Sequence, residues 1–367
     1  MGDGAAGVAA DVAVVGLGRR GLQLARWCAR VGLRVAWLCE RDGAALERAS
    51  AEFPGARTAR DWPELFAPAE RGELGGVVLA NDFDAHAAPS IAFLDRGVHV
   101  LSECAACADA EEGGRLLAAV ARSTASWSFA ENYVAHPHVR LIASALAAGE
   151  AGAPRLLECD YLHGLSEAAL RDMTGDPGHW RGRIGPTAYC THTVTPVLDV
   201  TGARPVEVTT HPVDGGERPA AVVMALRLSG GELALLRQTF LQGEPDSHWS
   251  WLSVRGTRGL VESVRAPGAG AWSVRVRNEP WAHGGSLRDE VRTPPELRLG
   301  GAPVERMEEG TALLVDAFRR SVTEGAPPRV PAGTAVAATL VGPAAAESLA
   351  RGSVPVRVPE AAVSARG

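Results

Sequence analysis

The chain has 367 residues, of which 46% are hydrophobic, and its formal net charge is -6. This length accommodates two domains that each bury a core. No apolar run reaches the roughly 18 residues that a membrane-spanning helix needs, and no basic cluster interleaved with aromatic residues indicates nucleic-acid binding. We therefore expect a cytoplasmic protein that acts on small molecules, with no membrane or nucleic-acid partner.

The first 120 or so residues alternate apolar runs with helix-like segments, in the βαβ rhythm of a parallel sheet. The predicted strands are residues 12–15, 35–38, 76–79 and 98–101, and the predicted helices include residues 22–31 and 44–52. From about residue 128, apolar and polar positions alternate over residues 156–161, 206–210, 220–228 and 232–239. This alternation is typical of an antiparallel sheet with one packed face. Loops at residues 265–270 and 293–303 precede a predicted helix at residues 310–320.

A glycine-rich motif follows the first predicted strand. Gly16, Gly18 and Gly21 form G-x-G-x-x-G between a strand and a helix, the setting in which this motif binds the pyrophosphate of a dinucleotide. The second predicted strand ends in Glu40, close to the distance at which an acid binds the ribose hydroxyls of NAD. A carboxylate would repel the additional phosphate of NADP, which favours NAD, whereas the neighbouring Arg41 keeps NADP possible.

These patterns together predict an α/β protein with two domains. Residues 1–125 are expected to form a Rossmann domain, a doubly wound parallel sheet that binds NAD(P). Residues 126–367 are expected to form an α/β domain with a large, mostly antiparallel sheet.

From residue 11 to about 355, the sequence resembles the Gfo/Idh/MocA oxidoreductases. The resemblance rests on the fingerprint, on GGVVLANDFDAHAAPSIAFLDRGVHVLSE, on AENY at residues 130–133 and on ECDYLH at residues 158–163. It implies a substrate between the two domains, over the nicotinamide, and a homodimer or homotetramer formed through the open sheet of the second domain. The implied cofactor contacts beyond those already named are Arg20, Asn81, His86, Glu103 and Asn132; His86 has a structural cap as its alternative role.

The sequence departs from this family at one position. The family follows the strand at residues 98–101 with Glu-Lys-Pro, and its lysine helps to move the hydroxyl proton during hydride transfer. Here Glu103 is followed by Cys104 and Ala105, and the chain has no lysine, since all 37 residues in the lysine and arginine count are arginine. This absence puts the usual alcohol dehydrogenation in doubt.

Cys104 also begins a C-x-x-C motif with Cys107. A metal clip would need two further ligands, and a redox pair belongs at the start of a helix without a dinucleotide loop upstream. We therefore interpret the segment as a strand end that carries Glu103 toward the nicotinamide, and we expect no metal. The six cysteines are scattered, which predicts reduced core thiols rather than disulfides.

The segment at residues 179–202 resembles a family branch that includes the NAD-dependent α-N-acetylgalactosaminidase-type glycosidases. Glu103, Tyr161, Tyr189 and His192 match its motif positions, whereas residues 193–195 depart from its usual Gly-Leu-Gly. We expect His192 to be the central acid or base, because imidazole titrates near neutrality. Tyr161 and Tyr189 are the expected catalytic partners. The alternatives are a buried histidine satisfied by hydrogen bonds and tyrosines with packing roles.

Other side chains of these segments are candidates for binding a sugar. The expected substrate contacts are Tyr133, His163, His179, Trp180 and Arg181, with capping or surface roles as the alternative. Trp249 and Trp251 could also stack on a sugar, although aromatic residues at strand spacing more often lie in a core.

Three functions remain open at this point. The first is an NAD(P)-dependent oxidoreductase that acts on a sugar, a glycoside or a related polyol. The second is a redox-neutral glycosidase or lyase that oxidises its substrate transiently and then eliminates a leaving group. The third is a regulatory protein that binds a dinucleotide without catalysis.

Overall fold

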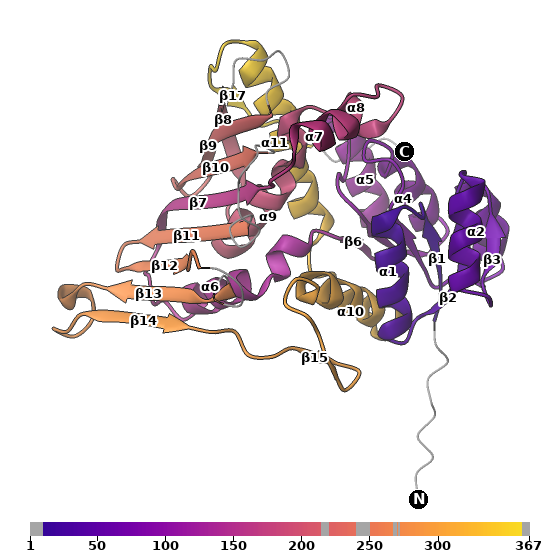
Figure 1. Ribbon diagram of the computed structural model, residues 1–367, viewed down its shortest axis with the longest axis horizontal. Coiled ribbons are helices and arrows are strands. Elements are labelled where there is room, and N and C mark those ends of the chain that lie inside the picture. The colour runs from indigo at the N-terminus through magenta and orange to yellow at the C-terminus, as the bar shows by residue number, and fades with distance from the viewer. Residues whose placement is uncertain (1–9, 214–219, 240–249, 267–269, 271, 362–367) are drawn as a thin grey trace, which may run out of the picture.

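The structure is a computed structural model that describes residues 10–213, 220–239, 250–266, 270 and 272–361. Two large β-sheets lie beside each other, with helices between and around them (Figure 1). This arrangement confirms the predicted α/β class.

The first sheet is parallel throughout, with its six strands in the order β3-β2-β1-β4-β5-β6. Its strands are β1 (Asp11–Val15), β2 (Arg34–Cys39), β3 (Arg57–Ala59), β4 (Gly76–Leu79), β5 (His99–Ser102) and β6 (Trp127–Phe129). Its helices are α1 (Arg19–Arg30), α2 (Gly43–Glu52), η1 (Trp62–Leu65), α3 (Phe66–Glu70), α4 (Ala87–Leu94) and α5 (Ala110–Arg122). This is the doubly wound order that the sequence predicts. Ligands of such sheets bind outside the carboxyl ends of the strands, where the strand order reverses.

The second sheet has nine strands in the order β14-β13-β12-β11-β7-β10-β9-β8-β17. Only β7 and β10 pair in parallel within it; the other described pairs are antiparallel. The strands are β7 (Pro154–Leu162), β8 (Pro205–Pro212), β9 (Ala221–Leu228), β10 (Leu233–Thr239), β11 (Ser250–Gly256), β12 (Leu260–Ser263), β13 (Val274–Asn278), β14 (Arg288–Arg292) and β17 (Val356–Arg357). Two short strands, β15 (Arg298–Leu299) and β16 (Ala302–Pro303), pair with each other.

Helices cover one face of the second sheet. The packed helices are α6 (Pro137–Ala147), α9 (Thr191–Thr201) and α11 (Ala332–Ala350) (Figure 1). Alternate strand residues such as Leu157, Met224 and Leu236 fill the core beneath them, which explains the period of two in the sequence. Shorter helical segments complete the chain: η2 (Asn132–Ala135), α7 (Glu167–Thr174), α8 (Trp180–Arg183), η3 (Pro186–Cys190) and η6 (Pro280–Ala282).

Helix α10 (Glu309–Glu324) follows the second sheet in sequence but packs against α1 of the first domain. Val315 and Phe318 of α10 share a hydrophobic cluster with Leu24 of α1. The first sheet also continues beyond the predicted boundary after residue 125, because β6 pairs with β5. Residues from the segment 126–367 therefore complete the core of the N-terminal domain.

Within the described residues, no helix combines the length and the apolar character needed to cross a membrane. The six cysteines are all buried and free.

Candidate active site

The turn between β1 and α1 is shaped by its three glycines. Gly16 has φ +85°, and a Cβ atom there would lie 2.4 Å from the carbonyl oxygen of Ala80. A Cβ atom on Gly21 would lie 1.8 Å from the carbonyl oxygen of Gly16. Gly18 differs, because a Cβ atom there would meet nothing within 4 Å. Gly16 and Gly21 are thus required by packing, whereas Gly18 leaves open space for a ligand beside the N-terminus of α1.

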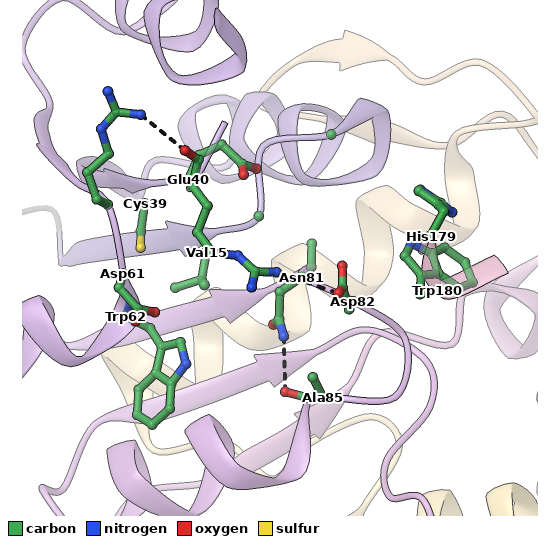
Figure 2. A pocket seen from close by; sticks show the side chains of 15 residues that line it. Val15, Cys39, Glu40, Asp61, Trp62, Asn81, Asp82, Ala85, His179 and Trp180 are labelled. Carbon is green, nitrogen blue, oxygen red and sulfur yellow. Dashed lines mark hydrogen bonds and ion pairs between the residues drawn. The ribbon is translucent and has the colours of Figure 1, made fainter. Parts of the chain in front are cut away.

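A cleft of about 310 Å³ lies beside this turn (Figure 2). Five predicted cofactor contacts line it, namely Gly16, Gly18, Glu40, Arg41 and Asn81. The other lining residues are Val15, Cys39, Arg60, Asp61, Trp62, Ala80, Asp82, Ala85, His179 and Trp180. His179 and Trp180, which we predicted to bind substrate, therefore also border the cofactor cleft.

Backbone amides orient the carboxylate of Glu40 at the end of β2. The amide of Leu17 donates to its Oε2 over 2.7 Å, and the amide of Asp42 donates to its Oε1 over 3.0 Å. Asn81 donates from Nδ2 to the carbonyl of Ala85 over 3.0 Å, while its Oδ1 is buried without a partner among the described residues. The cleft is thus lined by two hydrogen-bond acceptors, the held carboxylate of Glu40 and Oδ1 of Asn81. Acceptors fit the hydroxyl and amide donors of a dinucleotide.

The remaining predicted cofactor contacts lie outside the lining of this cleft. Glu103 forms an ion pair with Arg20, whose Nε lies 2.7 Å from Oε1, and Arg20 also donates to Thr311 of α10 over 2.9 Å. His86 is 2% exposed, and its Nδ1 lies 3.1 Å from the carbonyl oxygen of Ala105. Burial lowers the pKa of His86, so its ring is neutral. Nδ2 of Asn132 lies 3.3 Å from Nε2 of His136.

His192, at the start of α9, is held by a buried carboxylate. Its Nδ1 lies 2.9 Å from both carboxylate oxygens of Glu131, which follows β6 and is fully buried. Burial alone would raise the pKa of Glu131, but His192 and the hydrogen bonds from Cys104 and the amide of Tyr133 hold this pKa below its ordinary value. An ionised carboxylate can only accept hydrogen bonds, so Nδ1 carries the proton and Nε2 of His192 is the basic nitrogen.

Three tyrosines surround this imidazole, and we call them the aromatic wall: Tyr133, Tyr161 and Tyr189. The ring of Tyr133 stacks on His192 with centroids 4.4 Å apart. Tyr161 and Tyr189 lie 4.9 Å and 5.7 Å from His192, and their own rings stack 6.0 Å apart. The structure therefore brings together His192, Tyr161 and Tyr189, the residues predicted to be catalytic.

The phenols of the aromatic wall are poor bases. Burial raises the pKa of Tyr133, Tyr161 and Tyr189 above the ordinary value of a phenol. Each hydroxyl thus stays protonated at neutral pH and serves as a hydrogen-bond donor. Among His192 and these three tyrosines, Nε2 of His192 is therefore the acceptor, because Nδ1 donates to Glu131.

The other predicted substrate contacts lie around this wall. His163 follows β7, with its ring 6.0 Å from that of Tyr161. The guanidinium of Arg181 lies over the ring of Trp180, with Cζ 4.3 Å from the ring centroid. The ring of Phe83 also stacks on that of Trp180, with centroids 5.5 Å apart. Trp251 is buried and donates to the carbonyl of Ser263 over 2.6 Å, which is a packing role. Trp249 lies outside the described residues.

Cys104 occupies the position of the missing lysine and donates from its thiol to Glu131 over 3.3 Å. Potential metal-ligating atoms of Cys104, Glu131 and His192 lie within 4.8 Å of one another. Burial raises the pKa of the Cys104 thiol well above its ordinary value, so the thiol keeps its proton and donates it to the carboxylate. Cys104, Glu131 and His192 are thus joined by hydrogen bonds. Cys107 has a separate environment, close to Gly113 in the apolar core.

Sequence reasoning missed Glu131 as a functional residue. A signal was present, because Glu131 lies two residues after the buried strand β6 of the parallel sheet, at the edge where ligands bind. Phe83 was also missed, although it packs on Trp180 and lies 5.6 Å from Tyr189.

No known protein-family profile and no curated protein matches this sequence, but solved structures do. An NAD binding oxidoreductase from Klebsiella pneumoniae is 15% identical with a TM-score of 0.79, over 96% of this chain and 100% of that chain. A myo-inositol 2-dehydrogenase from Lactobacillus plantarum is 18% identical with a TM-score of 0.75, over the same shares. A levoglucosan dehydrogenase in complex with NADH and levoglucosan is 16% identical with a TM-score of 0.78, again over 96% and 100%. At these identities, the likeness shows that the chain shares their fold over nearly its whole length.

Proposed function

We propose that this protein is an NAD-dependent oxidoreductase of the Gfo/Idh/MocA type that oxidises a hydroxyl group of a sugar or polyol. The observation that carries the proposal is the buried Glu131 carboxylate, which holds Nδ1 of His192 and leaves Nε2 as a base within the aromatic wall. The motif resemblance and the shared fold support the same class.

The cofactor proposal rests on the cleft beside the glycine turn. Gly18 offers open space at the N-terminus of α1, and Asn81 offers a buried acceptor. Glu40 favours NAD, since its carboxylate would repel the additional phosphate of NADP. The solved structures of similar fold include an NAD binding oxidoreductase and a complex with NADH. A bound nicotinamide would accept the hydride from the carbon that carries the substrate hydroxyl.

In this mechanism the chain's own residues manage the proton. Nε2 of His192 takes the proton of the substrate hydroxyl while the hydride leaves the same carbon. The carboxylate of Glu131 stabilises the resulting imidazolium through Nδ1. The aromatic wall donates hydrogen bonds to substrate oxygens. His192 thus does the work that the family assigns to the absent lysine.

The substrate class follows from the same site. Aromatic faces bind the apolar faces of sugars, and phenol hydroxyls bind their oxygens. Two of the similar structures are a myo-inositol 2-dehydrogenase and a levoglucosan dehydrogenase. We infer a polyhydroxylated ring as the substrate.

A redox-neutral glycosidase or lyase is the second candidate, and the buried Cys104 at the lysine position is the observation that favours it. Elimination requires a second base to remove a proton from carbon. Burial keeps Tyr161 and Tyr189 protonated, so His192 would have to serve both steps. Net oxidation needs a single base and fits the site better.

Substitution of His192 tests the proposal. His192→Asn should lower kcat with NAD and a polyol by roughly 100-fold to 10,000-fold, because a positioned base contributes about this factor. The matched control is His211→Asn, since His211 is exposed on β8 and belongs neither to the lining of the cofactor cleft nor to the aromatic wall. Unchanged turnover in His192→Asn would refute the assigned base.

A further inference from the structure

Arg181 lies where the cofactor cleft meets the aromatic wall. Its guanidinium stacks on Trp180, with Cζ 4.3 Å from the ring centroid, and Trp180 lines the cofactor cleft. Arg181 also donates a hydrogen bond to Tyr189, and its positive charge acts on both Tyr189 and Tyr161. A cation therefore lies beside two of the three tyrosines that surround His192.

No acidic side chain in the described part of the chain forms an ion pair with Arg181, in contrast to its neighbours. Arg183, on the same short helix, pairs with Asp84 at 3.1 Å and with Asp82 at 3.6 Å. Arg20 pairs with Glu103 at 2.7 Å. Asp82, Asp84 and Glu103 are thus already engaged by other cations.

One donor of Arg181 is buried without an acceptor. Its Nε is shielded from solvent and has no hydrogen-bond partner among the described residues. Buried N–H groups without acceptors are rare in folded proteins, because they lose their hydrogen bonds to water. This donor therefore calls for an acceptor that the described residues do not supply.

We propose that the substrate carries an anionic group, a carboxylate or a phosphate ester, and that Arg181 binds it. This inference rests on the proposed function, since it names the chemical class of the sugar or polyol that is oxidised. It gives Arg181, an expected substrate contact, a more specific role.

The geometry suits this role in two ways. A guanidinium presents its N–H groups as a planar fork that matches carboxylate and phosphate oxygens, and stacking on Trp180 fixes the plane of the fork. Tyr189 connects Arg181 to the reaction centre, because it accepts a hydrogen bond from Arg181 and its ring lies 5.7 Å from His192. One sugar can therefore place its anionic group at Arg181 and its reacting hydroxyl at His192.

The test compares matched sugars on the full-length protein with NAD. The neutral probes are D-glucose, D-galactose and myo-inositol, and the anionic probes are D-glucuronate, D-galacturonate and D-glucose 6-phosphate. We expect kcat/KM for an anionic probe to exceed that of its neutral counterpart by at least about tenfold, since hydrogen bonds to charged groups contribute about this factor or more. The uronates and the phosphate ester distinguish the two possible anionic groups.

Variants of Arg181 assign this preference to one side chain. Arg181→Gln should raise KM for the anionic probe about 10-fold to 100-fold and change kcat and the neutral probes little. Arg181→Lys should restore part of the affinity, because it keeps the charge but loses the fork. Arg183→Gln is the matched control, since Arg183 lies on the same helix and is paired with acids; it should behave like the wild-type protein.

Calorimetric titration of the NADH-loaded protein with the same probes separates this inference from the proposed function. Anionic probes should bind the wild-type protein and lose affinity in Arg181→Gln, whether or not any of them is oxidised. If neutral probes are bound and oxidised as well as anionic ones, the inference of an anionic substrate is overturned, whereas the proposed oxidoreductase function stands. Loss of NADH affinity in Arg181→Gln, with unchanged preference among probes, would assign Arg181 to the cofactor and also overturn it.

Discussion

At the scale of single residues, the buried carboxylate of Glu131 determines which nitrogen of His192 carries a proton. The carboxylate contacts Nδ1 at 2.9 Å and is itself supported by the Cys104 thiol and the amide of Tyr133. Because these three groups donate hydrogen bonds to the carboxylate, its charge is stabilised despite full burial. The chemistry of the site thus depends on a residue that need not touch the substrate.

Glu131→Gln is expected to lower kcat by about 10-fold to 1,000-fold, since a neutral amide neither fixes the tautomer nor stabilises the imidazolium. The affinity for NADH should change little, because Glu131 lies outside the lining of the cofactor cleft. Steady-state kinetics and NADH titration measure the two effects. Glu111→Gln, an exposed position on α5, is the control, and equal kinetics for both variants would contradict a positioning role.

The difference between Glu40 and Glu131 shows what the sequence can reveal about a site. Glu40 is predictable because it lies at a known spacing after a glycine motif, so both signals are local. Glu131 and His192 are separated by 61 residues and meet only when the first sheet packs on α9. The resemblance of residues 179–202 predicts a role for His192, but its contact with Glu131 is a product of tertiary packing.

At the scale of elements, the turn from β1 to α1 separates glycines needed for folding from one needed for binding. Gly18→Ala should change the free energy of unfolding by less than about 1 kcal/mol, because its Cβ meets no atom. The same change should weaken NADH binding at least about tenfold by filling the open space. Gly21→Ala should destabilise the fold by several kcal/mol, since its Cβ would overlap the carbonyl of Gly16.

Urea unfolding and NADH titration of the two glycine variants test this separation. Gly18→Ala with full NADH affinity would contradict the location of the cofactor cleft. Gly21→Ala with wild-type stability would contradict the close approach of helix and strand.

Helix α6 begins beside two buried histidines, His136 and His138, and burial lowers the pKa of both. Burial lowers the pKa of His138 from its ordinary 6.5 to about 3. The unfolded chain therefore binds a proton at pH values where the folded chain does not, so this part of the stability is complete above pH 6.5 and falls as pH decreases toward 3. At pH 5 the loss from one such histidine is about 2 kcal/mol.

Urea unfolding of His138→Gln between neutral and mildly acidic pH measures this contribution. The variant should lose less stability than the wild-type protein on acidification, whatever its stability at neutral pH. His211→Gln, at an exposed position, should keep the wild-type dependence. Parallel curves for all three proteins would show that His138 does not titrate as its burial implies.

The elements themselves were predictable to different degrees. The strands β1, β2 and β4 are apolar runs of a buried parallel sheet, and β7 to β10 alternate with a period of two, so both patterns are visible in the sequence. Helix α11 was not predicted. It is rich in alanine, contains Pro343 and is buried on much of its surface, so it lacks the polar stripe by which an amphipathic helix is recognised.

At the scale of the whole molecule, α10 joins the two halves of the chain. It packs on α1 through Val315 and Phe318, while the fully buried Glu309 pairs with Arg306 and with Arg140 of α6. The packing of α10 on the N-terminal domain is a long-range contact, which changes of pattern along the sequence do not reveal. The boundary predicted after residue 125 therefore assigned α10 to the second domain.

We propose that the protein forms a homodimer or homotetramer through the face of the second sheet that α6, α9 and α11 leave uncovered. Leu156, Val223 and Leu235 alternate with the core positions on neighbouring strands and are only partly buried in the single chain. Sedimentation equilibrium should give an oligomeric mass, and Leu235→Arg should lower it, because a charge there would be desolvated in the interface. A wild-type monomer at micromolar concentration would contradict this assembly.

The central claim is a net oxidation with His192 as the base, and it is tested most directly by measuring NADH in a reaction with a deuterated substrate. The best substrate of the sugar panel, deuterated at the carbon that bears the reacting hydroxyl, is incubated with NAD and the wild-type protein. We predict one NADH for each substrate consumed, with the deuterium on the nicotinamide, and strongly reduced formation in His192→Asn. Consumption of substrate without accumulation of NADH would contradict the account and establish the redox-neutral reaction in its place.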